Sequence, residues 1–234
     1  MNLIHLTPAS PAPFNHPADI HLYAINHDAW HDTLPELEST LSRSELQRAK
    51  KFRFEYLRTR FIIRRGLLRR LLAHYTGTTP AAIVYTHSDH GKPALAPAMQ
   101  PPGFAFNVSH SDEYALFGFT HAAALGVDIE KPTPIPDMPL VAKHHFSTAE
   151  QVTLFSLRKE DRTTAFYRTW TRKEAIVKAI GNGITYPLDS FTVTLRPGEP
   201  AALTHARDKT LLRYKLANIP LDIPCIAACA IRPL

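Results

Sequence analysis

The segment Gly126-Val127-Asp128-Ile129-Glu130-Lys131 decides our prediction of the fold. Apolar and acidic side chains alternate along it, which is the pattern of a half-buried β-strand. Because successive side chains of a strand point to opposite faces, Asp128 and Glu130 share one face and lie about 6 to 7 Å apart along the chain. The sequence therefore predicts a strand that carries two carboxylates on one side.

The residues around this strand predict a mixture of helices and strands. Segments 104–109 and 114–120 are rich in aromatic and β-branched residues, and with residues 122–130 they predict three strands of a mostly antiparallel sheet. Further along, Ser147-Thr148-Ala149-Glu150 has the spacing of a capping box that opens a helix. The other predicted elements are a helix from about 164 to 180 that stops at Gly181-Asn182-Gly183, and strands at 190–195, 211–216 and 225–231.

Two proline-rich segments divide the chain. Residues 96–103 and 131–139 each contain several prolines, so both are predicted to be loops. The order of helix, strands, proline loop, helix and strands indicates an α+β fold of two halves joined near residues 126–140.

The composition is that of a soluble globular protein. The 234 residues are 44% hydrophobic and 21% charged, with a net charge of +6, which suits one large domain or two small ones. The longest apolar runs fall far short of the roughly 20 residues that cross a bilayer, so we expect no membrane span. Residues 1–15 lack the pattern of a secretory signal, and we expect a cytoplasmic protein. The two cysteines, Cys225 and Cys229, are expected to pack as small apolar residues.

The basic charge is concentrated in residues 43–70, which hold eleven Lys and Arg against two Glu, a net +9. Apolar residues recur at helical spacing through this segment, which predicts a helix that starts at a cap, Ser42 or Ser44, and ends before Gly77. One interpretation is a solvated basic helix face. The other is an electropositive groove for nucleic acid or a phosphorylated small molecule. Charge alone leaves both open.

Two groups of residues carry the acidic chemistry. Asp128 and Glu130 either point into solvent at a strand end or share a hard cation such as magnesium or manganese. In the segment 170–178, Glu174 and Lys178 are one helical turn apart, so they either form an ordinary ion pair or, with Lys173, place a metal and an ammonium group around phosphate.

Two further groups are compatible with phosphate contact. In segment 106–111, the adjacent Ser109 and His110 diverge on a strand, so phosphate binding suits them better than a nucleophile pair. The segment Gly91-Lys92-Pro93 is a tight turn that carries a cation, and by itself it indicates almost nothing.

Taken in order, five motifs resemble those of the Sfp-type 4'-phosphopantetheinyl transferases. They are GKP at 91–93, FNVSHS at 106–111, GVDIEK at 126–131, FS..E at 146–150 and W..KEA..K at 170–178. The motifs span about 90 residues, and the basic segment and the strand-rich tail fit the rest of the family's layout. The resemblance implies a pseudo-dimeric fold of two similar α+β halves. Residues 1–127 would form the half that holds the basic helix and the adenosine side of coenzyme A, and residues 128–234 the half that holds the metal and the catalytic helix.

The resemblance also implies the reaction. Such an enzyme moves the phosphopantetheine arm of coenzyme A, its substrate, onto a serine of an apo acyl or peptidyl carrier protein and releases adenosine 3',5'-bisphosphate. The cofactor would be Mg²⁺, with Mn²⁺ possible in its place. We expect a monomer with no nucleic-acid partner, while the carrier could serve fatty-acid, polyketide or nonribosomal-peptide synthesis.

Carried over motif by motif, the resemblance assigns roles to particular residues. Asp128, Glu130 and Glu174 would hold the metal. Glu174 would accept the serine proton, with Glu150 as the alternative, and Lys178 would stabilise or protonate the departing phosphate. The coenzyme A contacts would come from Arg48, Arg60, Gly91, Lys92, Pro93, Ser109, His110 and Lys173, of which Lys173 would contact the pyrophosphate. The roles of His144 and His145 are left open.

Two other classes of function use some of the same residues. A nucleic-acid-binding module would use the basic segment, but the sequence has no recognisable RNP, KH or zinc-ligand pattern. A metal-dependent phosphohydrolase would use the same carboxylates, but it would turn over coenzyme A with water and ignore a carrier protein.

Overall fold

The computed structural model describes residues 2–5, 20–88, 91–121, 124–181 and 183–232. The helices are α1 (Leu34–Ser39), α2 (Arg43–Ala49), α3 (Glu55–Thr76), α4 (Met138–His145), α5 (Thr148–Ser156) and α6 (Lys159–Ile180). The strands of the N-terminal half are β1 (Asn2–His5), β2 (His21–Asn26), β3 (Tyr85–His87), β4 (Pro93–Leu95), β5 (Ala105–Ser111) and β6 (Tyr114–Thr120). Those that follow are β7 (Ala124–Glu130), β8 (Phe191–Val193), β9 (Leu203–Ala206), β10 (Lys215–Asn218) and β11 (Ile226–Arg232).

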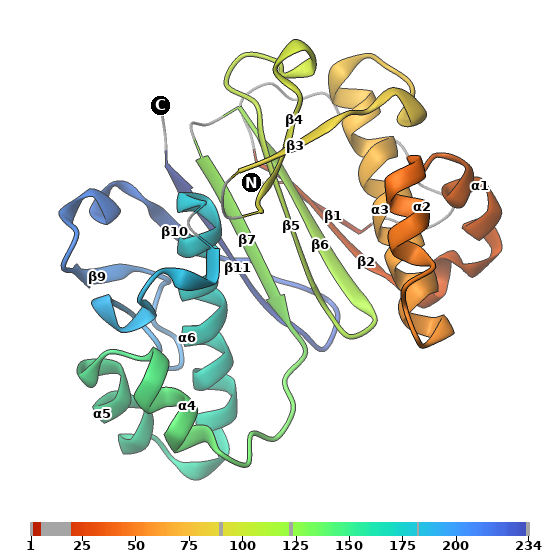
Figure 1. The fold of residues 1–234 in the computed structure, drawn as a ribbon. Helices are drawn as coiled ribbons and strands as arrows, with labels where there is room; N and C mark the ends of the chain where they lie inside the picture. The colour runs from red at the N-terminus through yellow and green to blue at the C-terminus, as the bar shows by residue number, and fades with distance from the viewer. Residues whose placement is uncertain (1, 6–19, 89–90, 122–123, 182, 233–234) are drawn as a thin grey trace.

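The fold has two α+β halves, each with a long helix packed on a sheet, as predicted (Figure 1). The N-terminal sheet has the order β1-β2-β6-β5, in which β1 is parallel to β2 and the other pairs are antiparallel. Its inner face packs on α3 through a buried aliphatic and aromatic cluster that includes Tyr23, Leu68, Leu72 and Phe117. The C-terminal sheet, β10-β11-β7, is antiparallel and is covered by α6.

The two sheets meet where β5 lies beside β7. No backbone ladder joins these strands; instead the side chain of Asn107 accepts a hydrogen bond from the backbone amide of Val127 at 2.9 Å. A third buried cluster fills the space between the sheets, with Leu22 and Leu116 from one half and Val127 and Cys229 from the other. The halves therefore share a core, and the acidic end of β7 lies at their junction.

Gly126 explains how closely α6 approaches β7. A Cβ at this position would lie 2.0 Å from the carbonyl oxygen of Ala175 and 2.4 Å from the amide nitrogen of Ala179, both on α6. Only glycine permits this backbone contact. The contact fixes the helix that carries Glu174 and Lys178 against the strand that carries Asp128 and Glu130.

The predicted division between residues 127 and 128 lies inside a strand. β7 runs through this boundary and pairs with β11 from Ala124 to Glu130. The strand therefore belongs as a whole to the C-terminal sheet, although its acidic side chains face the N-terminal half.

The single basic helix predicted over residues 43–70 is wrong, because α2 and α3 are separate helices. Ser42 caps α2 in a capping box with Glu45, and Gly77, at φ 66°, ends α3. Between the helices the chain turns so that Phe52 packs on Phe61, with ring centroids 5.3 Å apart. The partly buried Phe52 thus packs against the cluster around Phe61, although the surrounding Lys and Arg favour a continuous helix.

Most of the other predicted elements are confirmed, with shifted ends. β6 has the predicted bounds, and the predicted capping box of α5 at Ser147 is present. Helix α6 starts about five residues before the prediction and ends at Gly181, at φ 88°. The predicted strand at 211–216 is wrong in its first part: Asp208 accepts a hydrogen bond from the Thr210 amide at 2.9 Å, and a 3₁₀ turn occupies Lys209–Arg213 before β10 begins. Residues 122–123 of the predicted third strand lie outside the described residues.

Among the helices that the structure describes, none has the length and apolar character needed to cross a membrane.

Candidate active site

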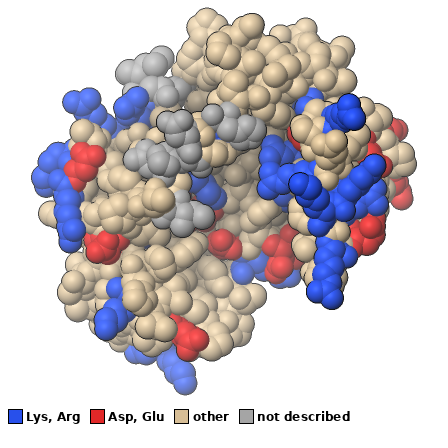
Figure 2. Space-filling view, viewed as in Figure 1, with Lys and Arg blue, Asp and Glu red and all other residues tan. Residues whose placement is uncertain are grey.

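A cavity of about 540 Å³ lies between the two halves. The C-terminal half contributes the acidic end of β7 and one face of α6, while α2, α3 and the end of β5 contribute a basic wall. Figure 2 shows Lys and Arg side chains gathered over α2 and α3 beside this junction. The predicted site residues that line the cavity are Arg48, Pro93, Ser109, His110, Asp128, Glu130, Glu174 and Lys178.

The acidic wall is organised around Asp128, which is only 2% exposed. One of its carboxylate oxygens, Oδ1, is 2.5 Å from the ammonium nitrogen of Lys178 and accepts a hydrogen bond from the Ser109 hydroxyl at 2.8 Å. Lys178 also donates to that hydroxyl at 2.8 Å. Three side chains from β5, β7 and α6 thus form one connected network.

Alternation along two neighbouring strands produces this arrangement. Ser109 and Ser111 lie on one face of β5, opposite Asp128 and Glu130 on β7. The Ser111 hydroxyl donates to Glu130 at 2.6 Å, as Ser109 does to Asp128. Each carboxylate of the acidic pair is therefore held by a serine from the other half. The sequence predicted neither bond: Ser109 was expected to contact phosphate, and Ser111 had no predicted role.

The carboxyl groups on this wall share a low-dielectric, negatively charged environment. Burial raises the pKa of Asp128, although the adjacent Lys178 opposes this effect. Burial also raises the pKa of Glu130 and of Glu174, and the nearby Asp128 carboxylate raises both further. A cation placed among these groups would lower all three pKa values.

The chemistry of the acidic wall fits a magnesium ion. The described residues do not gather three or more His, Cys, Asp or Glu side chains closely enough to ligate a metal ion in this arrangement. The second oxygen of Asp128, Oδ2, is nevertheless buried without a hydrogen-bond partner. An unpartnered buried carboxylate oxygen beside two more carboxylates is the hard donor set that Mg²⁺ or Mn²⁺ prefers.

The basic wall contains two arginines that the sequence analysis did not select. Arg64 and Arg65 line the cavity beside Arg48. The guanidinium groups of Arg48 and Arg65 lie over the Phe61 ring, 5.5 and 5.8 Å from its centroid. Burial lowers the pKa of Arg64, and the neighbouring Arg65 and Arg48 lower it further. Such crowding of like charges is relieved when an anion binds among them.

His110 lies between the two walls. Burial, assisted by the charge of Arg64, lowers its pKa to about 4. The imidazole is therefore neutral near pH 7 and can contact a phosphate only through its single N–H donor.

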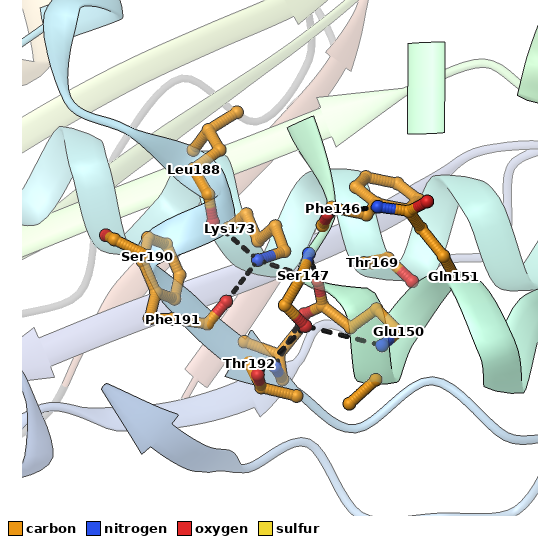
Figure 3. Close-up of polar contacts among 12 residues, drawn as sticks. Phe146, Ser147, Glu150, Gln151, Thr169, Lys173, Leu188, Ser190, Phe191 and Thr192 are labelled. Atoms are coloured by element: carbon orange, nitrogen blue, oxygen red, sulfur yellow. Dashed lines mark hydrogen bonds and ion pairs between the residues drawn. The ribbon is translucent and has the colours of Figure 1, made fainter. Parts of the chain in front are cut away.

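The structure places Lys173 and Glu150 away from the cavity, in a buried ion pair (Figure 3). The ammonium of Lys173 is 2.8 Å from Glu150 Oε2 and donates to the carbonyls of Leu188 at 2.7 Å and Phe191 at 2.5 Å. Both oxygens of Glu150 are occupied, because Oε1 accepts from the Val193 amide at 2.7 Å. The predicted contact of Lys173 with pyrophosphate and the alternative base role of Glu150 do not fit this arrangement.

The predicted turn at Gly91, Lys92 and Pro93 adjoins the cavity. With Val108, Lys178 and Gly183 it lines a neighbouring hollow of about 200 Å³. The Lys92 ammonium donates to backbone carbonyls of Leu125 and Lys178 rather than into the open space.

The remaining residues separate into cavity and surface positions. Arg60 does not line the cavity; its guanidinium lies 5.3 Å from the Tyr56 ring. His145 does line it and packs edge-on against Trp170, with centroids 5.4 Å apart, whereas His144 is exposed.

Acidic donors and a lysine face a cluster of arginines across one cleft, an arrangement typical of enzymes that act on phosphorylated substrates. Comparison with known families identifies the class. Residues 28–120 match the model of the 4'-phosphopantetheinyl transferase N-terminal region, and residues 124–228 match that of the 4'-phosphopantetheinyl transferase superfamily.

Individual relatives agree with the family models. The chain is 36% identical to the 4'-phosphopantetheinyl transferase HetI of Nostoc sp. over 213 residues, which cover 91% of this chain and 87% of that protein. It is 30% identical to the 4'-phosphopantetheinyl transferase Sfp of Bacillus subtilis over 67% of each chain. A mouse relative, L-aminoadipate-semialdehyde dehydrogenase-phosphopantetheinyl transferase, is 29% identical over 68% of this chain and 54% of its own length. The chain therefore belongs to the 4'-phosphopantetheinyl transferase superfamily, as its motifs predicted.

Proposed function

We propose that this protein transfers the 4'-phosphopantetheine group of coenzyme A to a serine hydroxyl of an apo acyl or peptidyl carrier protein. The observation that carries the proposal is the single cavity in which Asp128, Glu130, Glu174 and Lys178 face Arg48, Arg64 and Arg65. In the reaction, the serine oxygen forms a bond to the phosphorus that bears pantetheine. The bond from that phosphorus to the bridging oxygen breaks, and adenosine 3',5'-bisphosphate leaves.

The basic wall would bind the adenosine end of the substrate. Arg48, Arg64 and Arg65 provide planar guanidinium groups that can hold a phosphate bidentately. The neutral imidazole of His110 borders the same space and can add a hydrogen bond through its single N–H donor, whereas the Ser109 hydroxyl, also on this border, donates its proton to Asp128. The hollow beside Gly91 and Pro93 would accept the adenine ring.

The acidic wall would serve the pyrophosphate and the nucleophile. Asp128, Glu130 and Glu174 would hold Mg²⁺, or Mn²⁺ in its place, which when bound supplies positive charge to the phosphate oxygens. Glu174, which lines the cavity, would accept the serine proton; the alternative base, Glu150, is held in its ion pair with Lys173. The Lys178 ammonium is available on the cavity wall to stabilise the negative charge that develops on the leaving phosphate.

Incubation with coenzyme A, Mg²⁺ and a panel of apo carriers from fatty-acid, polyketide and nonribosomal-peptide synthases tests the proposal. Mass spectrometry is expected to show one carrier gaining a single phosphopantetheine, and an identical carrier whose acceptor serine is replaced by alanine remaining unchanged. Hydrolysis of coenzyme A at the same rate with and without carrier would instead identify a phosphohydrolase. RNA binding with steep salt dependence and no transfer to any carrier would identify a nucleic-acid-binding protein. The cytoplasmic location and the monomeric state stay predictions.

A further inference from the structure

Lys92 attaches the N-terminal half to the end of the catalytic helix. Its side chain leaves the loop between β3 and β4 and crosses to α6. The ammonium nitrogen donates to the carbonyl of Lys178 at 2.5 Å and lies 3.5 Å from the carbonyl of Ala179, in the last turn of α6. It also donates to the carbonyl of Leu125 on β7 at 3.1 Å.

These acceptors include carbonyls in the last turn of α6. The last four carbonyls of an α-helix have no partner within the helix. In α6 the amide of Gly181 satisfies the carbonyl of Val177 at 3.0 Å. The Lys92 ammonium reaches the next two, those of Lys178 and Ala179, where a cation is also favoured by the helix dipole.

The rest of the Lys92 residue is held in place for this contact. The backbone amide of Lys92 donates to the Ser88 hydroxyl at 3.1 Å, and its carbonyl accepts from the Ser88 amide at 2.9 Å. Its aliphatic stem lies against the helix cap, because a Cβ added to Gly181 would be 3.6 Å from Lys92 Cδ. The side chain is therefore anchored at its base, along its stem and at its tip.

We propose that Lys92 is a positioning residue, which holds the end of α6 against β7 and so sets the distance between Lys178 and Asp128. The contact joins the backbone of Lys178 to the backbone of Leu125, which is three residues before Asp128 on the same strand. The ion pair between Lys178 and Asp128 is 2.5 Å long, so a shift of about 1 Å in the helix end would stretch it to the limit of hydrogen-bond length. The inference rests on the proposed function for its kinetic consequence only.

The test compares Lys92→Met, which keeps an unbranched side chain one atom shorter and removes its donors, with Lys159→Met at an exposed position on the first turn of α6. Hydrogen exchange followed by mass spectrometry is measured first. We expect faster exchange in residues 175–181 of Lys92→Met, at least tenfold, with unchanged exchange in the core of α3. The Lys159→Met control is expected to exchange as the wild type does in both segments.

Steady-state transfer to a carrier is measured on the same samples, corrected for the folded fraction by circular dichroism. Lys92→Met is expected to lower kcat at least tenfold and to change KM for coenzyme A less than threefold. A raised KM with unchanged kcat would overturn the proposal, because it would make the ammonium a substrate ligand. Unchanged exchange in residues 175–181 would overturn it as well.

A second variant keeps the test decisive if Lys92→Met does not fold. Lys92→Arg retains the charge and the donors, and we expect it to keep the exchange protection of the α6 end and to recover part of kcat. Loss of both in Lys92→Arg would count against the proposal. If the wild type transfers nothing to any carrier, the proposed function fails, whereas the exchange experiment still decides whether Lys92 holds the helix.

Discussion

Replacement of Lys173 by methionine should destabilise the protein far more than it affects substrate binding. The side chains of Lys173 and Glu150 are both fully buried and 2.8 Å apart. Methionine fills a similar volume but leaves the Glu150 carboxylate without its cation. It also leaves the carbonyls of Leu188 and Phe191 without the ammonium donor.

The expected loss follows from these three contacts. Removal of one partner from a buried ion pair costs about 3–5 kcal/mol, because the remaining charge is neither solvated nor neutralised. Protonation of Glu150 limits the loss. Burial already raises the pKa of Glu150, and removal of Lys173, which lowers that pKa, raises it further. For a chain of this size the loss corresponds to a decrease in Tm of roughly 10 °C.

The pH dependence of this loss has a definite sign. In Lys173→Met, the folded-state pKa of Glu150 lies further above its unfolded value. At pH values between these two pKa values, the folded state binds more protons than the unfolded state. Stability of the variant therefore falls as pH rises through this range. We expect the difference in unfolding free energy between wild type and Lys173→Met to be larger at pH 8 than at pH 5.

Urea unfolding of the wild type, Lys173→Met, Glu150→Gln and the double variant measures the coupling. The double variant should be less destabilised than the sum of the single variants, because it buries no unpaired charge. The reasoning is refuted if Lys173→Met unfolds like the wild type while its KM for coenzyme A rises. That result would support the pyrophosphate contact that the family resemblance implied for Lys173.

Three further predictions follow from particular contacts. Asp128→Asn should lower the transfer rate by about 10²–10³-fold, measured by carrier mass gain, and near-wild-type turnover would contradict the acidic site. Burial and the charge of Arg64 lower the pKa of His27 to about 3 in the folded state. As the pH falls from 7 to 5, the imidazole is therefore protonated in the unfolded state but not in the folded state. Wild-type stability should fall by about 2 kcal/mol over this range. The contribution disappears in His27→Asn, whose urea-unfolding pH profile should be flatter by that amount; parallel profiles would contradict it. Gly126→Ala should cost about 1–3 kcal/mol or more and impair transfer, since the new methyl group overlaps the backbone of α6, and wild-type values for both Tm and rate would show that the contact yields without cost.

The elements that the sequence predicted well are those with a local physical signal. The alternation of residues 126–130 identified β7, and the Ser147 capping box and Gly181 located two helix ends. Each signal involves residues within one turn or one strand of each other. The break between α2 and α3 has no such signal, because it depends on Phe52 packing on Phe61, nine residues later, across a turn.

The sequence does contain a signal for one arginine of the basic wall, Arg64. Arg64 lies three residues after Phe61 and four before Leu68, two positions that the sequence places on the apolar face of the helix. A charged residue on an apolar face is buried only where something compensates its charge. The family resemblance selects Arg60, one turn earlier, but the Arg60 guanidinium lies over the Tyr56 ring and does not line the cavity.

Lys173 and Lys178 lie on either side of Glu174 in the sequence, but one is buried in the C-terminal half and the other lines the cavity. Helix geometry explains only part of this difference. At 100° per residue, Glu174 and Lys178 lie about 40° apart around α6, whereas Lys173 lies about 140° from Lys178. Periodicity therefore predicts that Lys173 and Lys178 lie on different faces of α6, but it does not predict that other parts of the chain pack over both faces. In an amphipathic helix on a single sheet, a lysine on the second face would lie in water. Here Leu188 and Phe191 cover that face, and the lysine is stable there because Glu150, from the capping box of another helix, supplies the opposite charge. The KEA motif thus combines a lysine that holds the C-terminal half together with a glutamate that faces the cavity, and only their packing partners assign the two roles.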